Sequence, residues 1–162
     1  MDRAIIDQYE QGGQKLRDAV RGLSQVDLLW VPPPDADVGR WSIQQIVLHL
    51  MDADLIWTAR MKCIIAEDDP LIVGYDESKF AAELFYDQQD ADSAIRIFDL
   101  NRRQFAGVLR KLPDSAFSRA GRHNERGAVT LGQSVHWMVE HVEHHLGFVR
   151  RKRERLGKPL KD

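Results

Sequence analysis

The sequence contains one cysteine and no long apolar run, and both absences restrict what the protein can be. The single cysteine, Cys63, excludes a disulfide framework and fits a reducing compartment. No stretch approaches the roughly 18 consecutive apolar residues that a membrane-spanning helix needs, and residues 1–10 lack the apolar core of a signal peptide. The net charge of −2 gives no reason to expect nucleic-acid binding. We therefore expect a cytoplasmic protein without a membrane segment or a nucleic-acid partner.

Convincing strand alternation is also missing, whereas helical periodicity recurs along the chain. The chain has 162 residues, of which 43% are apolar, and this suits a single domain over residues 1–162. The long segments with helical periodicity cover residues 3–23, 42–65, 92–112 and 130–149, and a shorter amphipathic piece covers 80–86. They predict an all-α four-helix bundle with longer crossover connections, in which the packing order of the helices stays open.

Local signals mark where two of these helices begin and where one is interrupted. Ser42 is followed three residues later by Gln45, and Thr130 by Gln133, so both helices open with a capping box. Gly12-Gly13 stands inside the first segment, and we expect it to disturb a smooth helix there. The polar stretch before Thr130 is predicted to be a loop.

Three of the six histidines lie where a single metal ion could hold them together. His141 and His145 are four residues apart, which places both on one face of a helix. His145 also takes an interior position, between Val142 and Val149, where an aliphatic residue is expected. His49 lies beside the apolar stripe of the 42–65 helix. If these two helices face each other, the sequence predicts a three-histidine metal site with an open coordination position.

Each of these histidines also has a plainer interpretation. A single interior histidine is commonly a hydrogen-bonded core residue, and amphipathic helices carry histidine pairs by chance. If a metal is bound, imidazole ligands favour a transition metal such as Zn or Ni over Ca or Mg. The carboxylates of Asp52, Glu140 and Glu143 could orient the rings from outside or be ordinary surface charges.

The residues named so far resemble the DinB-like metalloprotein superfamily, which includes the YfiT-type thiol transferases. The resemblance spans about residues 5–155, and its matching stretches are Trp41–Leu50 (WSIQQIVLHL), Gly74–Glu77 (GYDE), Thr130–Gly132 (TLG) and His141–Leu146 (HVEHHL). It implies a four-helix bundle, often dimeric, that holds a divalent transition metal through His49, His141 and His145. Relatives include transferases for low-molecular-weight thiols, a mycothiol-dependent isomerase and metal-dependent hydrolases without a known substrate.

On this resemblance we expect a homodimeric enzyme that transfers a low-molecular-weight thiol to an electrophilic small molecule. Two alternatives stay open: a metal-dependent hydrolase that uses a metal-bound hydroxide, and a non-catalytic metal-binding helical bundle. The sequence assigns no general acid or base. Four arginines are available to bind the carboxylates of a thiol cofactor, although each also fits an ordinary surface position: Arg60, Arg102, Arg103 and Arg122. The basic end over residues 150–161 is most simply a solvated helix terminus.

Overall fold

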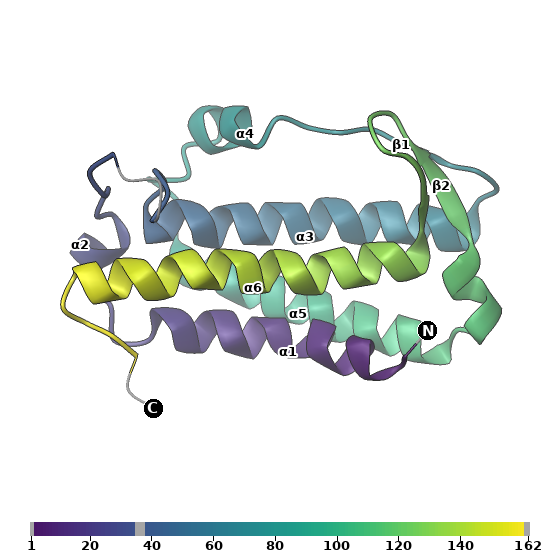
Figure 1. Cartoon of the computed structure of the whole chain (residues 1–162), viewed down its shortest axis with the longest axis horizontal. Coiled ribbons are helices and arrows are strands. Elements are labelled where there is room, and N and C mark those ends of the chain that lie inside the picture. The colour runs from purple at the N-terminus through teal and green to yellow at the C-terminus, as the bar shows by residue number, and fades with distance from the viewer. Residues whose placement is uncertain (1, 35–37, 161–162) are drawn as a thin grey trace.

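The computed structural model describes residues 2–34 and 38–160, and four long helices run alongside one another in this part of the chain (Figure 1). Their bounds are α1 Ala4–Val20, α3 Ile43–Ala66, α5 Ala91–Lys111 and α6 Leu131–Arg155. The predicted four-helix bundle is confirmed, and the last helix continues beyond residue 149 into the basic end. A short helix, α2 (Gln25–Leu28), lies between α1 and α3. No helix of the described residues is long and apolar enough to span a membrane.

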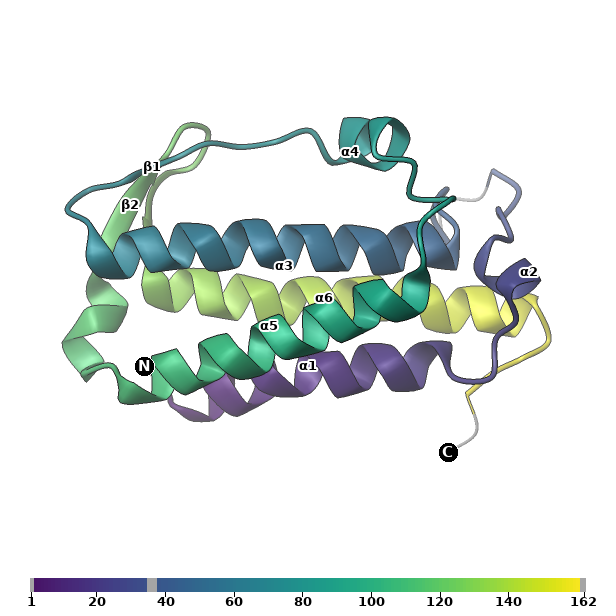
Figure 2. The same cartoon turned by 180° about the vertical axis from the view of Figure 1, so that it is seen from behind.

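The packing order, which the sequence left open, is not that of a simple up-and-down bundle. Helix α1 packs against α5 and α6, and α3 packs against the same two helices, so α1 and α3 are diagonal to each other. Figures 1 and 2 show α3 and α5 running in one direction and α1 and α6 in the other. Parallel neighbours need a crossover, and residues 67–90 supply it by returning along the length of α3.

That crossover carries β1 (Leu71–Ile72) and the helix α4 (Glu77–Glu83). The sequence predicted an amphipathic piece starting at residue 80, but α4 starts at Glu77. The Asp76 side chain accepts a hydrogen bond from the backbone N–H of Lys79 and so caps the helix earlier. The earlier start matters because it places Glu77 on a helix above the bundle (Figure 1).

The structure also contains a small three-stranded sheet, which no alternating pattern in the sequence indicated. Strand β2 (Ala120–His123) pairs in parallel with β1 and antiparallel with β3 (Gly127–Thr130). The stretch expected to be a loop therefore forms a hairpin, preceded by a 3₁₀ helix, η1 (Asp114–Ser118). Strands of two to four residues are too short for an alternating pattern to show in the sequence.

The two predicted capping boxes are confirmed. The Ser42 hydroxyl accepts a hydrogen bond from the backbone N–H of Gln45, and the Thr130 hydroxyl accepts one from that of Gln133; both glutamine side chains bond back to the cap. These bonds fix the first turns of α3 and α6, the two helices that carry His49, His141 and His145.

The core consists of two apolar clusters, one toward each end of the bundle, with a polar layer between them. One cluster includes Leu16, Leu50 and Phe98, and the other includes Ile6 and Phe105 together with their neighbours. At the level between them, each of α1, α3 and α5 places glycine or a polar side chain inside. The residues of this layer are Gly12, Gly13, Asp54, Thr58, Asn101 and Arg102.

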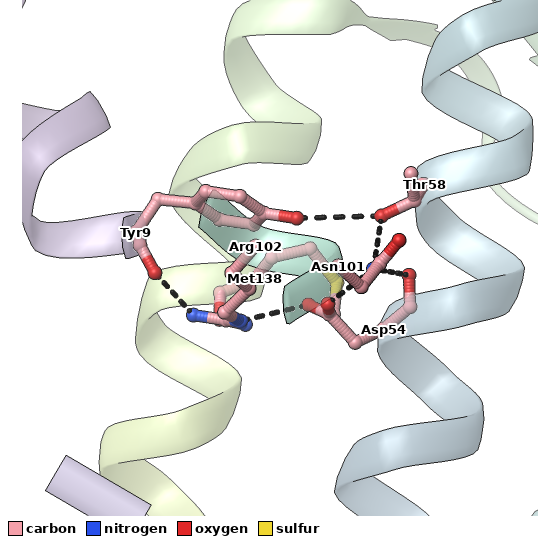
Figure 3. Close-up of polar contacts among 6 residues, drawn as sticks. All are labelled: Tyr9, Asp54, Thr58, Asn101, Arg102 and Met138. Atoms are coloured by element: carbon pink, nitrogen blue, oxygen red, sulfur yellow. Dashed lines mark hydrogen bonds and ion pairs between the residues drawn. The ribbon is translucent and has the colours of Figure 1, made fainter. Parts of the chain in front are cut away.

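Arg102 occupies the centre of the layer and bonds to all three other long helices (Figure 3). Its guanidinium donates to the carboxylate of Asp54 (2.8 Å) and to the carbonyl oxygens of Tyr9 (2.9 Å) and Met138 (2.8 Å). The Arg102 and Asp54 side chains are both fully buried. Arg102 is therefore neither the cofactor-binding nor the surface residue that the sequence suggested.

The two glycines do not disturb α1, which is continuous through them, contrary to our expectation. A Cβ added at Gly13 would stand 2.8 Å from the Cα of Asp99, and one added at Gly12 would stand 3.1 Å from the Cζ of Arg102. Both positions lack room for a side chain because α5 comes too close. The glycines therefore serve the approach of α1 to α5 at the level of the polar layer.

Candidate metal centre

The structure brings together the three histidines that the sequence singled out. His49 projects from α3, and His141 and His145 project from α6, across the contact between these antiparallel helices. Each offers a ring nitrogen, and these three atoms all lie within 4.8 Å of one another. The Nε2 atoms of His49 and His141 are 3.0 Å apart.

Aromatic rings cover one side of the cluster. Trp41, the residue before the α3 cap, lies with its ring centroid 4.9 Å from that of His49 and 6.4 Å from that of His145, the latter nearly parallel at 9°. The capping box at Ser42 fixes where the chain enters α3, and this entry sets the position of Trp41. The indole packs against two of the three rings on that side, where a second cavity is lined by Trp41 and His145.

The protonation state of the rings suits metal binding. Burial, and next the charge of a neighbouring imidazole, lowers the pKa of His49, His141 and His145 to about 3. All three rings are therefore neutral at pH 7, and neutral imidazole is the form that binds a metal.

The geometry of the ring nitrogens also suits a metal. Two nitrogens bonded tetrahedrally to one zinc ion at about 2.0–2.1 Å stand about 3.3 Å apart, close to the spacing of the His49 and His141 Nε2 atoms. In addition, the buried Nδ1 of His145 has no hydrogen-bond partner among residues 2–34 and 38–160. Buried polar atoms are rarely left unpaired, so the donor set fits a divalent transition metal.

Glu77 is a functional candidate that the sequence reasoning missed. Its carboxylate Oε2 lies 4.0 Å from the Nε2 of His49, the same atom that faces His141. Burial raises the pKa of this carboxyl, although its side chain is still half exposed. In the sequence, the GYDE stretch that contains Glu77 was notable only as part of the family resemblance. The capping residue Asp76 was the signal that would have placed Glu77 at the start of a helix.

The carboxylates proposed to orient the rings do other things. Asp52 accepts a hydrogen bond of 2.6 Å from the Tyr86 hydroxyl, and Glu143 pairs with Lys15 at 2.5 Å. Glu140 is exposed and lines the cavity described next. Within the described part of the chain, none of the three acids forms a hydrogen bond to a histidine of the cluster.

Two of the remaining arginine candidates are committed to surface ion pairs. Arg103 pairs with Asp99 at 3.1 Å, and Arg122 pairs with Asp69 at 2.6 Å. Arg60 instead lies against the ring of Trp57, with its Cζ 4.8 Å from the centroid. Among the four arginines considered for a cofactor, Arg60 thus contacts Trp57, a residue in the wall of the cavity described next.

A cavity of about 250 Å³ adjoins the histidine cluster between α3 and α6. His141 and Glu77 contribute to its wall at one end, and the rings of Trp57, Tyr75 and Trp137 form much of the rest. Of the three histidines, His141 lines this cavity, so a small molecule in it would lie beside that ring. Three neutral imidazoles, one carboxylate and a cavity together can hold a metal ion, a substrate and the proton that the substrate releases.

Comparison with known proteins gives an independent line of evidence. The model of the DinB superfamily matches residues 8–149. YfiT of Bacillus subtilis, which carries the name "Putative metal-dependent hydrolase", is 26% identical over 153 residues, which are 94% of this chain and 84% of YfiT. A protein of Oceanobacillus iheyensis with the same kind of name is 27% identical over 111 residues, covering 68% of this chain and 64% of that protein's length.

Solved structures agree on the fold. The structure of YfiT, described as an unusual four-helix bundle topology, superimposes with a TM-score of 0.87 over 95% of this chain and 86% of YfiT, at 24% identity. The mycothiol-dependent maleylpyruvate isomerase superimposes with a TM-score of 0.66 at 10% identity, over 88% of this chain and 58% of the isomerase. The parallel packing of α3 and α5 is thus shared with a known bundle.

Proposed function

Because the chain belongs to the DinB superfamily, we propose that it is a metal-dependent enzyme that transfers a low-molecular-weight thiol to an electrophilic small molecule. The observation that carries the proposal is the convergence of three ring nitrogens within 4.8 Å beside a cavity that also contains a carboxylate. A purely structural metal site would be closed on all sides, whereas this cluster adjoins open space.

His49, His141 and His145 would hold the metal, for which imidazole ligands favour Zn or Ni. A divalent metal held there would favour the anionic form of a thiol or water molecule that reaches it. The protein's own contribution is to keep the three rings neutral, to pack the Trp41 ring against two of them and to leave access from the cavity beside His141.

In this proposal Glu77 takes the proton. Its carboxylate lies 4.0 Å from the His49 Nε2 and lines the cavity, so a thiol bound there would have a proton acceptor within reach. Once the S–H proton is on Glu77, the sulfur forms a bond to the electrophilic carbon of the acceptor. The leaving group departs from that carbon with the bonding electrons. The homodimer and the cytoplasmic location expected from the sequence remain predictions.

A hydrolase is the second candidate, and the names of the relatives favour it. In that case Glu77 would take its proton from a water molecule rather than from a thiol, and an ester or amide would occupy the cavity. The two reactions use the same residues, so they are distinguished by substrate and not by geometry.

The test is an assay of metal-loaded protein with monochlorobimane and either bacillithiol, mycothiol or glutathione, in parallel with a panel of esters, amides and lactones. We expect thiol conjugation above the rate without enzyme, lost on chelation and in the His145→Ala variant. His144→Ala is the matched control because His144 is the exposed neighbour on the same helix. Glu77→Gln should lower the rate by about 100-fold, and Glu83→Gln, at the exposed end of the same helix, should not.

The outcomes separate the candidates. Hydrolysis that chelation abolishes, without any thiol-dependent conjugation, would replace the transferase by the hydrolase. A protein that binds no metal under any loading condition would exclude both reactions.

A further inference from the structure

Resting on the proposed function, the geometry points to a binding site for a flat organic anion, an aromatic or conjugated carboxylate, in the cavity beside His141. Arg126 is the residue that pairs with the carboxylate. The site would hold the acceptor molecule while its reactive carbon faces the histidine cluster.

Aromatic rings shape the cavity for a planar molecule. Trp57 from α3 and Trp137 from α6 meet with their ring centroids 5.9 Å apart and their planes at 80°, so they form two walls at nearly a right angle. Tyr75, on the crossover segment, adds a third ring. The volume of about 250 Å³ lies just below the usual range for small-molecule sites. Flat rings gain most from such walls because they can contact one indole face to face and the other edge to face.

The guanidinium of Arg126, in the wall of this cavity, and that of Arg60, against two of its aromatic residues, lie on ring faces instead of on carboxylates. The Cζ of Arg126 is 5.2 Å from the centroid of Trp137, and that of Arg60 is 4.8 Å from Trp57 and 5.7 Å from Tyr75. Arg60 donates a hydrogen bond to the Val73 carbonyl.

Among residues 2–34 and 38–160, neither guanidinium forms an ion pair. Elsewhere on the surface the pattern differs, since Arg110, Arg119 and Arg122 all pair with carboxylates. A ring face holds a guanidinium without satisfying its N–H donors, so these donors remain available to an anion.

The turn of the hairpin brings Arg126 into the neighbourhood of Arg60, which is on α3. His123, at the end of β2, is buried and lies against Trp57 with ring centroids 6.1 Å apart. Burial lowers the pKa of His123, and the charges of Arg60 and Arg126 both lower it further. His123 therefore lies near both guanidinium groups, and Glu125 opposes their charge there only in part.

The acidic groups around the cavity decide between an anion and a cation. Glu77 lies 4.0 Å from the His49 Nε2 and also feels the charge of Arg126, and Glu125 partly compensates Arg60. Glu140 is the remaining carboxylate on the wall, and it is exposed. Among residues 2–34 and 38–160, Arg126 forms no direct ion pair with any of these carboxylates, and we assign the ligand's carboxylate to it. A cationic ligand would instead depend on Glu140.

The test measures binding of benzoate and of benzamide, its neutral analogue of the same shape, to the zinc-loaded protein. The indole N–H signals in the NMR spectrum report the site, because Trp57 and Trp137 line it whereas Trp30 lies elsewhere. We expect benzoate to shift the first two signals and to bind about tenfold more tightly than benzamide. Arg126→Gln should remove that advantage, and Arg122→Gln, on the preceding strand and paired with Asp69, should keep it.

Equal affinity for benzoate and benzamide, or an unchanged benzoate affinity in Arg126→Gln, would overturn the proposal. A loss of binding in Glu140→Gln without a loss in Arg126→Gln would indicate a cationic ligand and would also overturn it.

The same titration in the His145→Ala background keeps this proposal separate from the proposed reaction. His145 does not line the cavity, so the dependence on Arg126 should persist there even if no thiol is ever transferred. Benzoate binding that disappears with His145 would show that the anion binds the metal instead of Arg126.

Discussion

Asp54→Asn should destabilise the protein far more than its conservative shape suggests. The substitution keeps the size of the side chain but removes its charge, and it leaves the Arg102 guanidinium buried without a counter-ion. Both side chains have no solvent exposure, and the bond between them is 2.8 Å. Removing one partner of a buried ion pair costs about 3–5 kcal/mol. We expect a loss in this range, since no water can reach Arg102 in place of the carboxylate.

Replacing both members of the ion pair is informative because Arg102 also binds two carbonyl oxygens. Tyr9 and Met138 lie inside helices, where their carbonyls have backbone partners as well. Replacing both charged residues, as in Asp54→Asn with Arg102→Met, should therefore cost much less than the sum of the two single losses. A coupling free energy of about 2 kcal/mol or more is the expected result.

Urea unfolding of metal-free protein, followed by tryptophan fluorescence, measures these free energies without a contribution from metal binding. Thr58→Val provides a milder step in the same network, because it removes a hydroxyl that accepts a bond of 2.9 Å from Asn101, and should cost about 1 kcal/mol. It keeps the test usable if Asp54→Asn does not fold. A loss below about 1 kcal/mol for Asp54→Asn, or additive single losses, would refute a buried and uncompensated charge as the cause.

Three further predictions concern other parts of the molecule. Gly13→Ala should destabilise the protein by about 1–3 kcal/mol because the new methyl group would meet the Asp99 backbone. Gly107→Ala, with open space around the new methyl group, should instead stabilise it by about 0.5–1 kcal/mol. Urea unfolding measures both changes, and the same sign for both would contradict the packing argument. Chelation should lower the Tm of the wild-type protein and leave that of His145→Ala unchanged, as scanning calorimetry can measure. Ser42→Ala should cost about 1 kcal/mol through loss of the α3 cap, and Ser42→Asp should recover most of it.

The sequence predicted those features that depend on local pattern. Apolar periodicity located the four long helices, and the Ser42 and Thr130 caps marked two of their starts because capping depends on residues three apart. The histidine cluster followed from one local spacing and from a single residue, His49, on a helix that had to face it. The prediction assumed that the two histidine-bearing helices pack face to face, and the structure supports this assumption.

Features that depend on long-range packing were not accessible. The Arg102 network joins four helices, and no local pattern distinguishes this arginine from the surface residue Arg103 beside it. Glu77 and Arg126 reach the site only through the crossover and the hairpin, whose strands are too short to show a period. The glycines of α1 looked like a helix interruption because the approach of α5 cannot be inferred from α1 alone.

The polar layer and the histidine cluster lie next to each other along α3 and α6. Asp54 follows His49 on α3, and Met138 precedes His141 on α6 by less than one turn. Arg102 bonds to both Asp54 and Met138, so it fixes how far α3 and α6 can slide past each other. A shift of one turn is about 5.4 Å, more than the whole spread of the three ring nitrogens. A hydrophobic layer would pack at many registers, whereas directional bonds from one guanidinium to three helices favour a single one.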